Sequence, residues 1–249
     1  MEQETRGREK IQLAYSLITI EQTKSPISEA YRTLRTNVQF TGVDSETKKI
    51  MITSSGPREG KSSTVANLAV SMAQTGKCVL VVDADLRNPT QHKLFGLDNR
   101  RGLSVALVQE QDYRNYIRET AVPGVKVLTG GPIPPNPAEL VGSNRMKRLI
   151  KEFSQEYDIV LIDTPPVIAV TDAAVLAHEV DGVILVLASG EVNKDYALRA
   201  KELLDKVGAK ILGAVLNKAD LKTGEYNYYY YYHGSDDSNK KKQKHHKDR

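Results

Sequence analysis

The sequence has few of the features that place a protein in a membrane or outside the cell. Its single cysteine, Cys78, excludes an internal disulfide and fits a reducing compartment. Its longest apolar run, about Val183–Ala188, is far too short to cross a bilayer, and the polar segment Met1–Lys10 predicts no signal peptide. No cysteines and histidines have the spacing of metal ligands. We therefore expect any role at a membrane to depend on a partner.

Most of the chain also has little net charge. The net charge is +4, of which residues 233–249 carry +3 and the rest of the chain only +1. A nearly neutral body gives no indication of nucleic-acid binding. We interpret the basic end as a solubilising tail, and contact with anionic lipid headgroups or with an acidic partner is the alternative.

Continuous Val/Ile/Leu runs alternate with helical patterns through most of the chain. Such runs are typical of a parallel sheet that helices cover on both faces. The expected strands are residues 50–53, 78–82, 125–128, 159–162, 183–187 and 211–216, and the expected helices are 26–42, 61–75, 144–156 and 194–206. Cys78, at the start of one run, is expected to be a small core residue. We predict an α/β domain over residues 25–220, after a flexible or partly ordered segment 1–24 and before a tyrosine-rich, basic tail 221–249.

A phosphate-binding loop is predicted between the first strand and the helix that follows it. The loop contains Gly60-Lys61-Ser62, and its backbone N–H groups would point at phosphate oxygens. Lys61 would add positive charge, and the Ser62 hydroxyl would bind Mg²⁺. The predicted nucleotide-binding residues of the loop are Ser55, Gly56, Pro57, Arg58, Glu59, Gly60, Lys61, Ser62 and Ser63. Ser55 replaces the first glycine of the usual pattern, and a plain strand-to-helix turn is the alternative.

Aspartates follow two of the other apolar runs. Asp83 and Asp85 come after residues 79–82, and Asp163 comes after residues 159–162. The carboxyl ends of parallel strands face the ligand, and buried carboxylates are costly unless they meet a cation or a proton donor. The sequence therefore predicts a Mg²⁺ site formed by Ser62, Asp83, Asp85 and Asp163. A helix cap or a turn is the alternative for Asp83 and Asp85.

Half of the 12 tyrosines lie together near the end of the chain, at Tyr226, Tyr228, Tyr229, Tyr230, Tyr231 and Tyr232. Each buried phenol needs a hydrogen-bonding partner, so a core has no place for five in a row. Disordered tails in turn usually contain few aromatic residues. Beside a nucleotide site, the tyrosine cluster is interpreted as the phosphoacceptor of a kinase that is its own substrate.

These motifs, together with the segment Gly131–Leu140, resemble the bacterial tyrosine kinases (BY-kinases). The chain looks most like the separate cytoplasmic kinase subunit of Gram-positive capsule and exopolysaccharide systems, over about residues 25–232. The resemblance implies a P-loop NTPase-type fold and an ATP- and Mg²⁺-dependent tyrosine kinase. Such a kinase phosphorylates its own tail in trans and regulates polysaccharide synthesis and export.

The resemblance also implies roles for single residues. Lys61 would act in catalysis, Asp83 would be the base toward the incoming tyrosine, and Asp85 would support the metal or the base. Asp163 would complete the metal site, and Asn217 would contact adenine. Arg58 departs from the glycine that is usual in the family.

Partners are implied in the same way. Glu29, Arg32 and Arg35 match the family pattern Glu-x-x-Arg-x-x-Arg, which implies a contact between subunits of a ring, an octamer in the family. The spacing puts the three side chains near one helix face, and an ordinary solvated charged face is the alternative. A membrane-embedded activator, a cognate tyrosine phosphatase and protein substrates are also implied. The resemblance, through the membrane-embedded activator, also implies a kinase in the cytoplasm at the inner face of the plasma membrane.

Two rival interpretations remain. One is a MinD/ParA-like ATPase, although such proteins carry a signature lysine where this chain has Gly56. The other is a non-catalytic nucleotide switch in a polysaccharide assembly complex.

Overall fold

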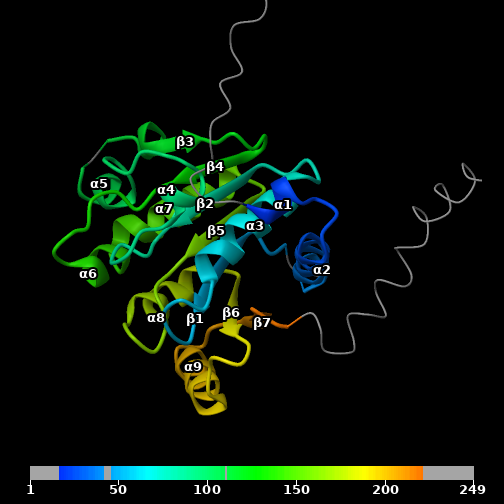
Figure 1. The fold of residues 1–249 in the computed structure, drawn as a ribbon. Coiled ribbons are helices and arrows are strands. Elements are labelled where there is room, and N and C mark those ends of the chain that lie inside the picture. The colour runs from blue at the N-terminus through cyan, green and yellow to red at the C-terminus, as the bar shows by residue number, and fades with distance from the viewer. Residues whose placement is uncertain (1–16, 42–45, 110, 221–249) are drawn as a thin grey trace, which may run out of the picture. The chain divides into compact units, whose positions relative to one another are not determined.

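The computed structural model describes residues 17–41, 46–109 and 111–220. The strands of this part form one sheet in the order β3-β4-β2-β5-β1-β6-β7 (Figure 1). The strands are β1 Lys49–Ser54, β2 Val79–Asp83, β3 Ile117–Glu119, β4 Val125–Leu128, β5 Ile159–Asp163, β6 Gly182–Ala188 and β7 Ile211–Asn217. All neighbours pair in parallel except β3 with β4. The predicted mostly parallel α/β fold is confirmed.

Helices cover both faces of this sheet, as the continuous apolar strands predict. The helices are α1 Ile18–Glu21, α2 Pro26–Phe40, α3 Lys61–Ala73, α4 Gln91–Leu94, α5 Leu103–Val108, α6 Pro137–Val141, α7 Asn144–Glu156, α8 Asp172–Leu176 and α9 Lys194–Lys206, with the 3₁₀ turns η1 Tyr113–Tyr116 and η2 Ala177–Glu179. One apolar core joins α2, α3 and α4 to one face, and a second joins α5 to α9 to the other (Figure 1). The sheet is therefore the middle layer of three.

Local signals explain where the long helices begin. The Ser25 side chain accepts a hydrogen bond from the Ser28 N–H, and Pro26 occupies the first turn of α2. Ser143 caps α7 in the same way. Burial along α2 is uneven, because Val38 packs into the core while Ile27, in the first turn, is 40% exposed.

One expectation about the edges of the domain needs correction. Cys78 is exposed rather than part of the core. Cys78 lies just before β2, and its backbone N–H donates to the Asp158 carboxylate at 2.8 Å. Its side chain therefore precedes the buried part of the strand. Upstream, Leu17 is buried in the core beside α3 and is followed by α1, so ordered structure begins before residue 25. The first 16 residues lie outside the described part.

The last strand ends the ordered sheet at its edge. β7 pairs only with β6 among the described strands, and its Leu216 is 62% exposed. Contacts divide the chain into the units Met1–Asn217 and Lys218–Arg249, and every helix and strand above belongs to the first. No helix of the described residues combines the length and apolar content needed to span a bilayer.

Candidate active site

The predicted site residues converge at the carboxyl ends of three adjacent strands. β2, β5 and β1 are neighbours in the sheet, and Asp83 lies directly opposite Asp163 in the parallel register. The phosphate loop leaves β1 and leads into α3, whose first residue is Lys61. The topology thus brings the loop and all three aspartates to one place, as the pattern of strands and aspartates predicts.

Lys61 contacts three side chains of this cluster. Its Nζ lies 2.8 Å from Asp85 Oδ2, 3.4 Å from Asp163 Oδ1 and 3.2 Å from Ser62 Oγ. Burial alone would lower the pKa of Lys61, but the charges of Asp163 and Asp85 outweigh it and raise that pKa well above its ordinary value. Lys61 is therefore protonated and offsets part of the negative charge around it.

Asp83 has an unusual environment for a carboxylate. It is fully buried, and its Oδ2 accepts the backbone N–H groups of Thr90 at 2.8 Å and Gln91 at 2.9 Å. Its Oδ1 has no hydrogen-bonding partner in the described residues. Burial and the charge of Asp163 raise the pKa of Asp83 well above its ordinary value. Asp83 consequently binds a proton more readily than an exposed aspartate does.

The phosphate loop is held by its own residues and by the end of β7. Gly60 has a φ of 91°, and a Cβ there would lie 2.0 Å from the Asn217 side-chain nitrogen, so glycine is required on both grounds. That nitrogen donates to the Glu59 carbonyl at 2.9 Å. Asn217, which sequence resemblance assigns to adenine, thus lies against the loop.

The remaining loop side chains divide into buried and exposed ones. The Glu59 carboxylate is buried, accepts hydrogen bonds from Ser55 Oγ and the Gly56 N–H, and accepts the Ala188 N–H on its other oxygen. Arg58 is exposed and has a φ of 62°, a conformation that glycine adopts without steric cost. Although Arg58 replaces the glycine that is usual in the family, the backbone at this position has a conformation that a glycine would adopt.

Sequence reasoning missed Gln91. Its side-chain amide nitrogen donates to Asp163 Oδ2 at 2.8 Å and to the Ser62 carbonyl at 3.1 Å, while its side chain is fully buried. It also missed Asp172, a buried residue of α8 that pairs with both ends of the Arg87 guanidinium at 3.0 Å. Neither residue belongs to a recognisable motif, and only the fold reveals their contacts.

The donor set fits a nucleotide and a hydrated Mg²⁺. The loop supplies backbone N–H groups and Lys61, and the unpartnered Asp83 Oδ1 and Gln91 Oε1 are buried acceptors that still need donors. Among the described residues, no three or more acidic, histidine or cysteine side chains form a metal cage by themselves. Mg²⁺ does not require one, because it usually binds one or two carboxylates together with phosphates and waters.

The predicted subunit contact has internal partners in this chain. Arg32 pairs with Glu29 at 2.6 Å on the exposed face of α2. Arg35 instead donates to the Ser71 carbonyl of α3 at 2.8 Å. The three residues therefore do not share one environment, and the ring contact stays a prediction. The phosphoacceptor tyrosines 226–232 lie outside the described residues.

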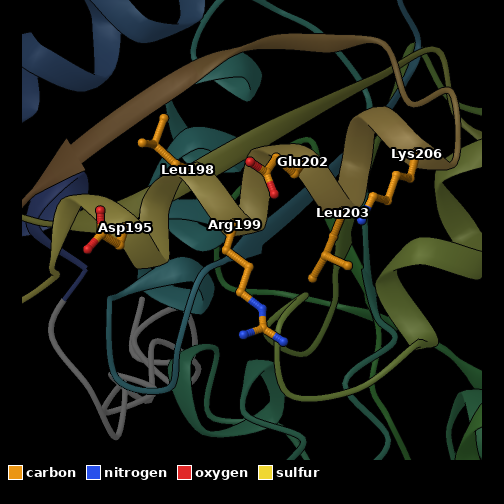
Figure 2. A pocket seen from close by; sticks show the side chains of 6 residues that line it. All are labelled: Asp195, Leu198, Arg199, Glu202, Leu203 and Lys206. Carbon is orange, nitrogen blue, oxygen red and sulfur yellow. The ribbon is translucent and has the colours of Figure 1, made fainter.

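A pocket of about 460 Å³ lies along α9, apart from this cluster (Figure 2). The described residues that line it are Asp195, Leu198, Arg199, Glu202, Leu203 and Lys206. All of them belong to one helix, and none is a predicted site residue. The pocket therefore shares no residue with the cluster at the strand ends.

Comparisons with known proteins identify the family of the chain. The family described as "ParA: NUBPL iron-transfer P-loop NTPase" matches residues 46–248. Tyrosine-protein kinase YwqD of Bacillus subtilis is 48% identical over 214 residues, covering 86% of this chain and 90% of that protein.

Two solved structures separate the kinases from their wider fold class. The crystal structure of the chimerical protein CapA2B2 matches with a TM-score of 0.79 and 46% identity, over 82% of this chain and 89% of its own. The septum site-determining protein MinD of Pyrococcus horikoshii, complexed with Mg-ADP, has a TM-score of 0.60 and 26% identity, over 72% of this chain and 73% of its own. The chain therefore belongs to the ParA-type P-loop NTPases and, among them, to the bacterial protein-tyrosine kinases.

Proposed function

We propose that this kinase uses ATP and Mg²⁺ to phosphorylate its own C-terminal tyrosine cluster in trans, and that it thereby regulates capsular or exopolysaccharide synthesis and export. The observation that carries the proposal is the convergence of Asp83, Asp85 and Asp163 on Lys61, beside a phosphate loop. A basic group and several carboxylates at this position are what Mg²⁺-dependent phosphoryl transfer requires.

The proposed reaction moves one phosphoryl group and one proton. A tyrosine oxygen bonds to the γ-phosphorus of ATP, the bond from that phosphorus to the β–γ bridging oxygen breaks, and ADP leaves with the electron pair. A phenol has a pKa of about 10, so its proton must be accepted as the bond forms. Asp83 is the proposed acceptor, and its raised pKa suits that role.

The other residues act by position and charge. Lys61 would exchange its carboxylate partners for phosphate oxygens and offset the charge that develops in the transition state. Mg²⁺ would supply further positive charge to the phosphates, with Ser62, Asp83, Asp85 and Asp163 as its proposed holders. The N–H groups of residues 55–63 would orient the phosphate chain.

The proposed partners follow from the family. A membrane-embedded activator would complete the site and keep the kinase at the inner face of the plasma membrane. Copies of the chain would form a ring, an octamer by resemblance, and a cognate phosphatase would reverse the modification. Isolated chain should then be a poor kinase that a cytoplasmic peptide of the activator stimulates; full activity without any partner contradicts this part.

Incubation with γ-labelled ATP, Mg²⁺ and the cytoplasmic peptide of the activator tests the central proposal. We expect label on the tail of the wild-type protein, none in Lys61→Met, and none when Tyr226 and Tyr228–Tyr232 are changed to Phe. Nucleotide hydrolysis without label would instead support a MinD-like ATPase. Binding without hydrolysis or label would support a nucleotide switch.

A further inference from the structure

Gln91 joins the three motifs of the site, and it is the feature that the proposed chemistry does not yet use. Its side-chain nitrogen donates to Asp163 Oδ2 and to the Ser62 carbonyl, and its backbone N–H donates to Asp83 Oδ2. One residue of α4 therefore contacts the loop helix, the end of β2 and the end of β5 at once.

The chemistry of its neighbours fixes the orientation of the amide. The Asp163 carboxylate and the Ser62 carbonyl are both acceptors, so the NH₂ end must face them and Oε1 must face away. Oε1 then has no partner among the described residues, although the side chain is fully buried. A buried amide oxygen without a donor is costly unless water or a ligand supplies one.

The hydrogen bonds of Gln91 also determine which carboxylate oxygens of Asp163 and Asp83 remain available to a cation. Asp163 Oδ2 is held by Gln91, which leaves Oδ1 facing Lys61 at 3.4 Å. Asp83 Oδ2 is likewise held by backbone N–H groups, which leaves its Oδ1 unpartnered. Groups that hold metal-binding side chains in this manner set their orientation and their affinity for the metal.

We infer that Gln91 is a positioning residue, which orients Asp163 and Ser62 for a divalent cation and offers Oε1 to a water of its hydration shell. This inference rests on the proposed nucleotide and Mg²⁺ site. Gln91 itself neither touches the phosphate nor accepts the proton.

The test measures Mg²⁺ dependence rather than kinase activity. A fluorescent ADP analogue is titrated with the full chain in EDTA and at increasing Mg²⁺. Gln91→Leu should raise the Mg²⁺ concentration for half-maximal tightening by about 10–100-fold, while binding in EDTA is unchanged. Gln91→Asn, which withdraws the amide by one methylene but keeps a buried polar group, should shift it in the same direction.

Asn67→Leu is the matched control. Asn67 is also a buried amide with hydrogen bonds from the Thr19 N–H and hydroxyl, but it contacts none of the three aspartates. Its loss should lower stability and leave the Mg²⁺ dependence as in wild type. Unchanged Mg²⁺ dependence in folded Gln91→Leu or Gln91→Asn, or an equal shift in Asn67→Leu, overturns the inference alone. Absence of nucleotide binding by the wild-type chain overturns the proposed function together with it.

Discussion

Among the single residues of the site, negative charge exceeds positive charge. Two carboxylates, of Asp85 and Asp163, contact the Lys61 ammonium group, and a third, of Asp83, lies opposite Asp163 on the adjacent strand. Asp83 and Asp163 are fully buried. Such an arrangement stabilises a ligand at the expense of the empty fold, which is a common compromise in active sites. Neutralising the unpaired carboxylate of Asp83 should therefore move stability and activity in opposite directions.

Asp83→Asn should make the nucleotide-free protein more stable while it abolishes tyrosine phosphorylation. The folded pKa of Asp83 is raised above 3.8, so folding carries no penalty while both states are protonated, and the penalty grows as pH rises toward the folded pKa. Asparagine should thus gain roughly 1 kcal/mol at pH 7 and little below about pH 4. Urea unfolding at both pH values measures the difference, and a gain that is larger at the acidic pH contradicts it.

Gly60→Ala should be more harmful than Gly76→Ala, although both glycines have positive φ. Gly76 has open space around it. Alanine there should therefore lower the free energy of unfolding only by the cost of a left-handed backbone conformation, roughly 1–2 kcal/mol. At Gly60 the added Cβ also meets the Asn217 side chain. Free energies of unfolding from urea titrations give the comparison.

The Asn217→Ala background removes the atoms that Gly60→Ala would meet. In that background, Gly60→Ala should cost about as much as Gly76→Ala does in wild type. If the cost of Gly60→Ala were the same with and without the Asn217 side chain, the close approach would not be its cause.

At the scale of elements, the sequence predicts long periodic segments well and short ones poorly. The residues of α7 and α9 match the predicted ranges, because their apolar spacing and flanking caps are strong local signals. β3, α4, α5, α6 and α8 were not predicted, since each has only three to six residues and too little sequence to show a period. Their positions are decided by packing against the sheet.

The same contrast holds inside the site. Lys61, Asp83 and Asp163 were predicted because a glycine-rich loop, or an aspartate after an apolar strand, can be recognised as part of a nucleotide site from the sequence alone. Gln91 was not, because glutamine marks no motif and its side-chain contacts lie 29 and 72 positions away. Residues that hold others in place are visible only once the elements are assembled.

The two arginines of α2 should respond differently to substitution. Arg35→Met removes a charged hydrogen bond from α2 to the Ser71 carbonyl of α3 and should lower the free energy of unfolding by about 1.5–3 kcal/mol. Arg32→Met removes a pair with Glu29 and a hydrogen bond to the Thr23 carbonyl, but both are exposed to solvent, so it should cost less than about 1 kcal/mol. Chemical denaturation of both variants decides this, and equal losses contradict the separate environments. Light scattering on the same samples shows whether either variant changes the mass in solution.

At the scale of the whole molecule, phosphorylation should reverse the net charge. Each phosphotyrosine adds about −1.5 to −2, so four to six of them add roughly −6 to −12 to a chain of net charge +4. If neighbours dock each other's tails, this change should release them and dissociate the assembly. We expect a smaller mass by light scattering for the phosphorylated form than for the form with the tail tyrosines changed to Phe; identical masses rule this out.

The contacts of Lys61 also bear on which anions the kinase can distinguish. Because Asp85 and Asp163 already engage the ammonium group, an incoming anion has to compete with ligands that the protein itself provides. Inorganic phosphate or sulfate would exchange one anionic partner of Lys61 for another and gain little. A nucleotide polyphosphate gains the N–H groups of the loop at the same time. We therefore expect the acidic cluster to favour binding of long phosphate chains over that of small anions.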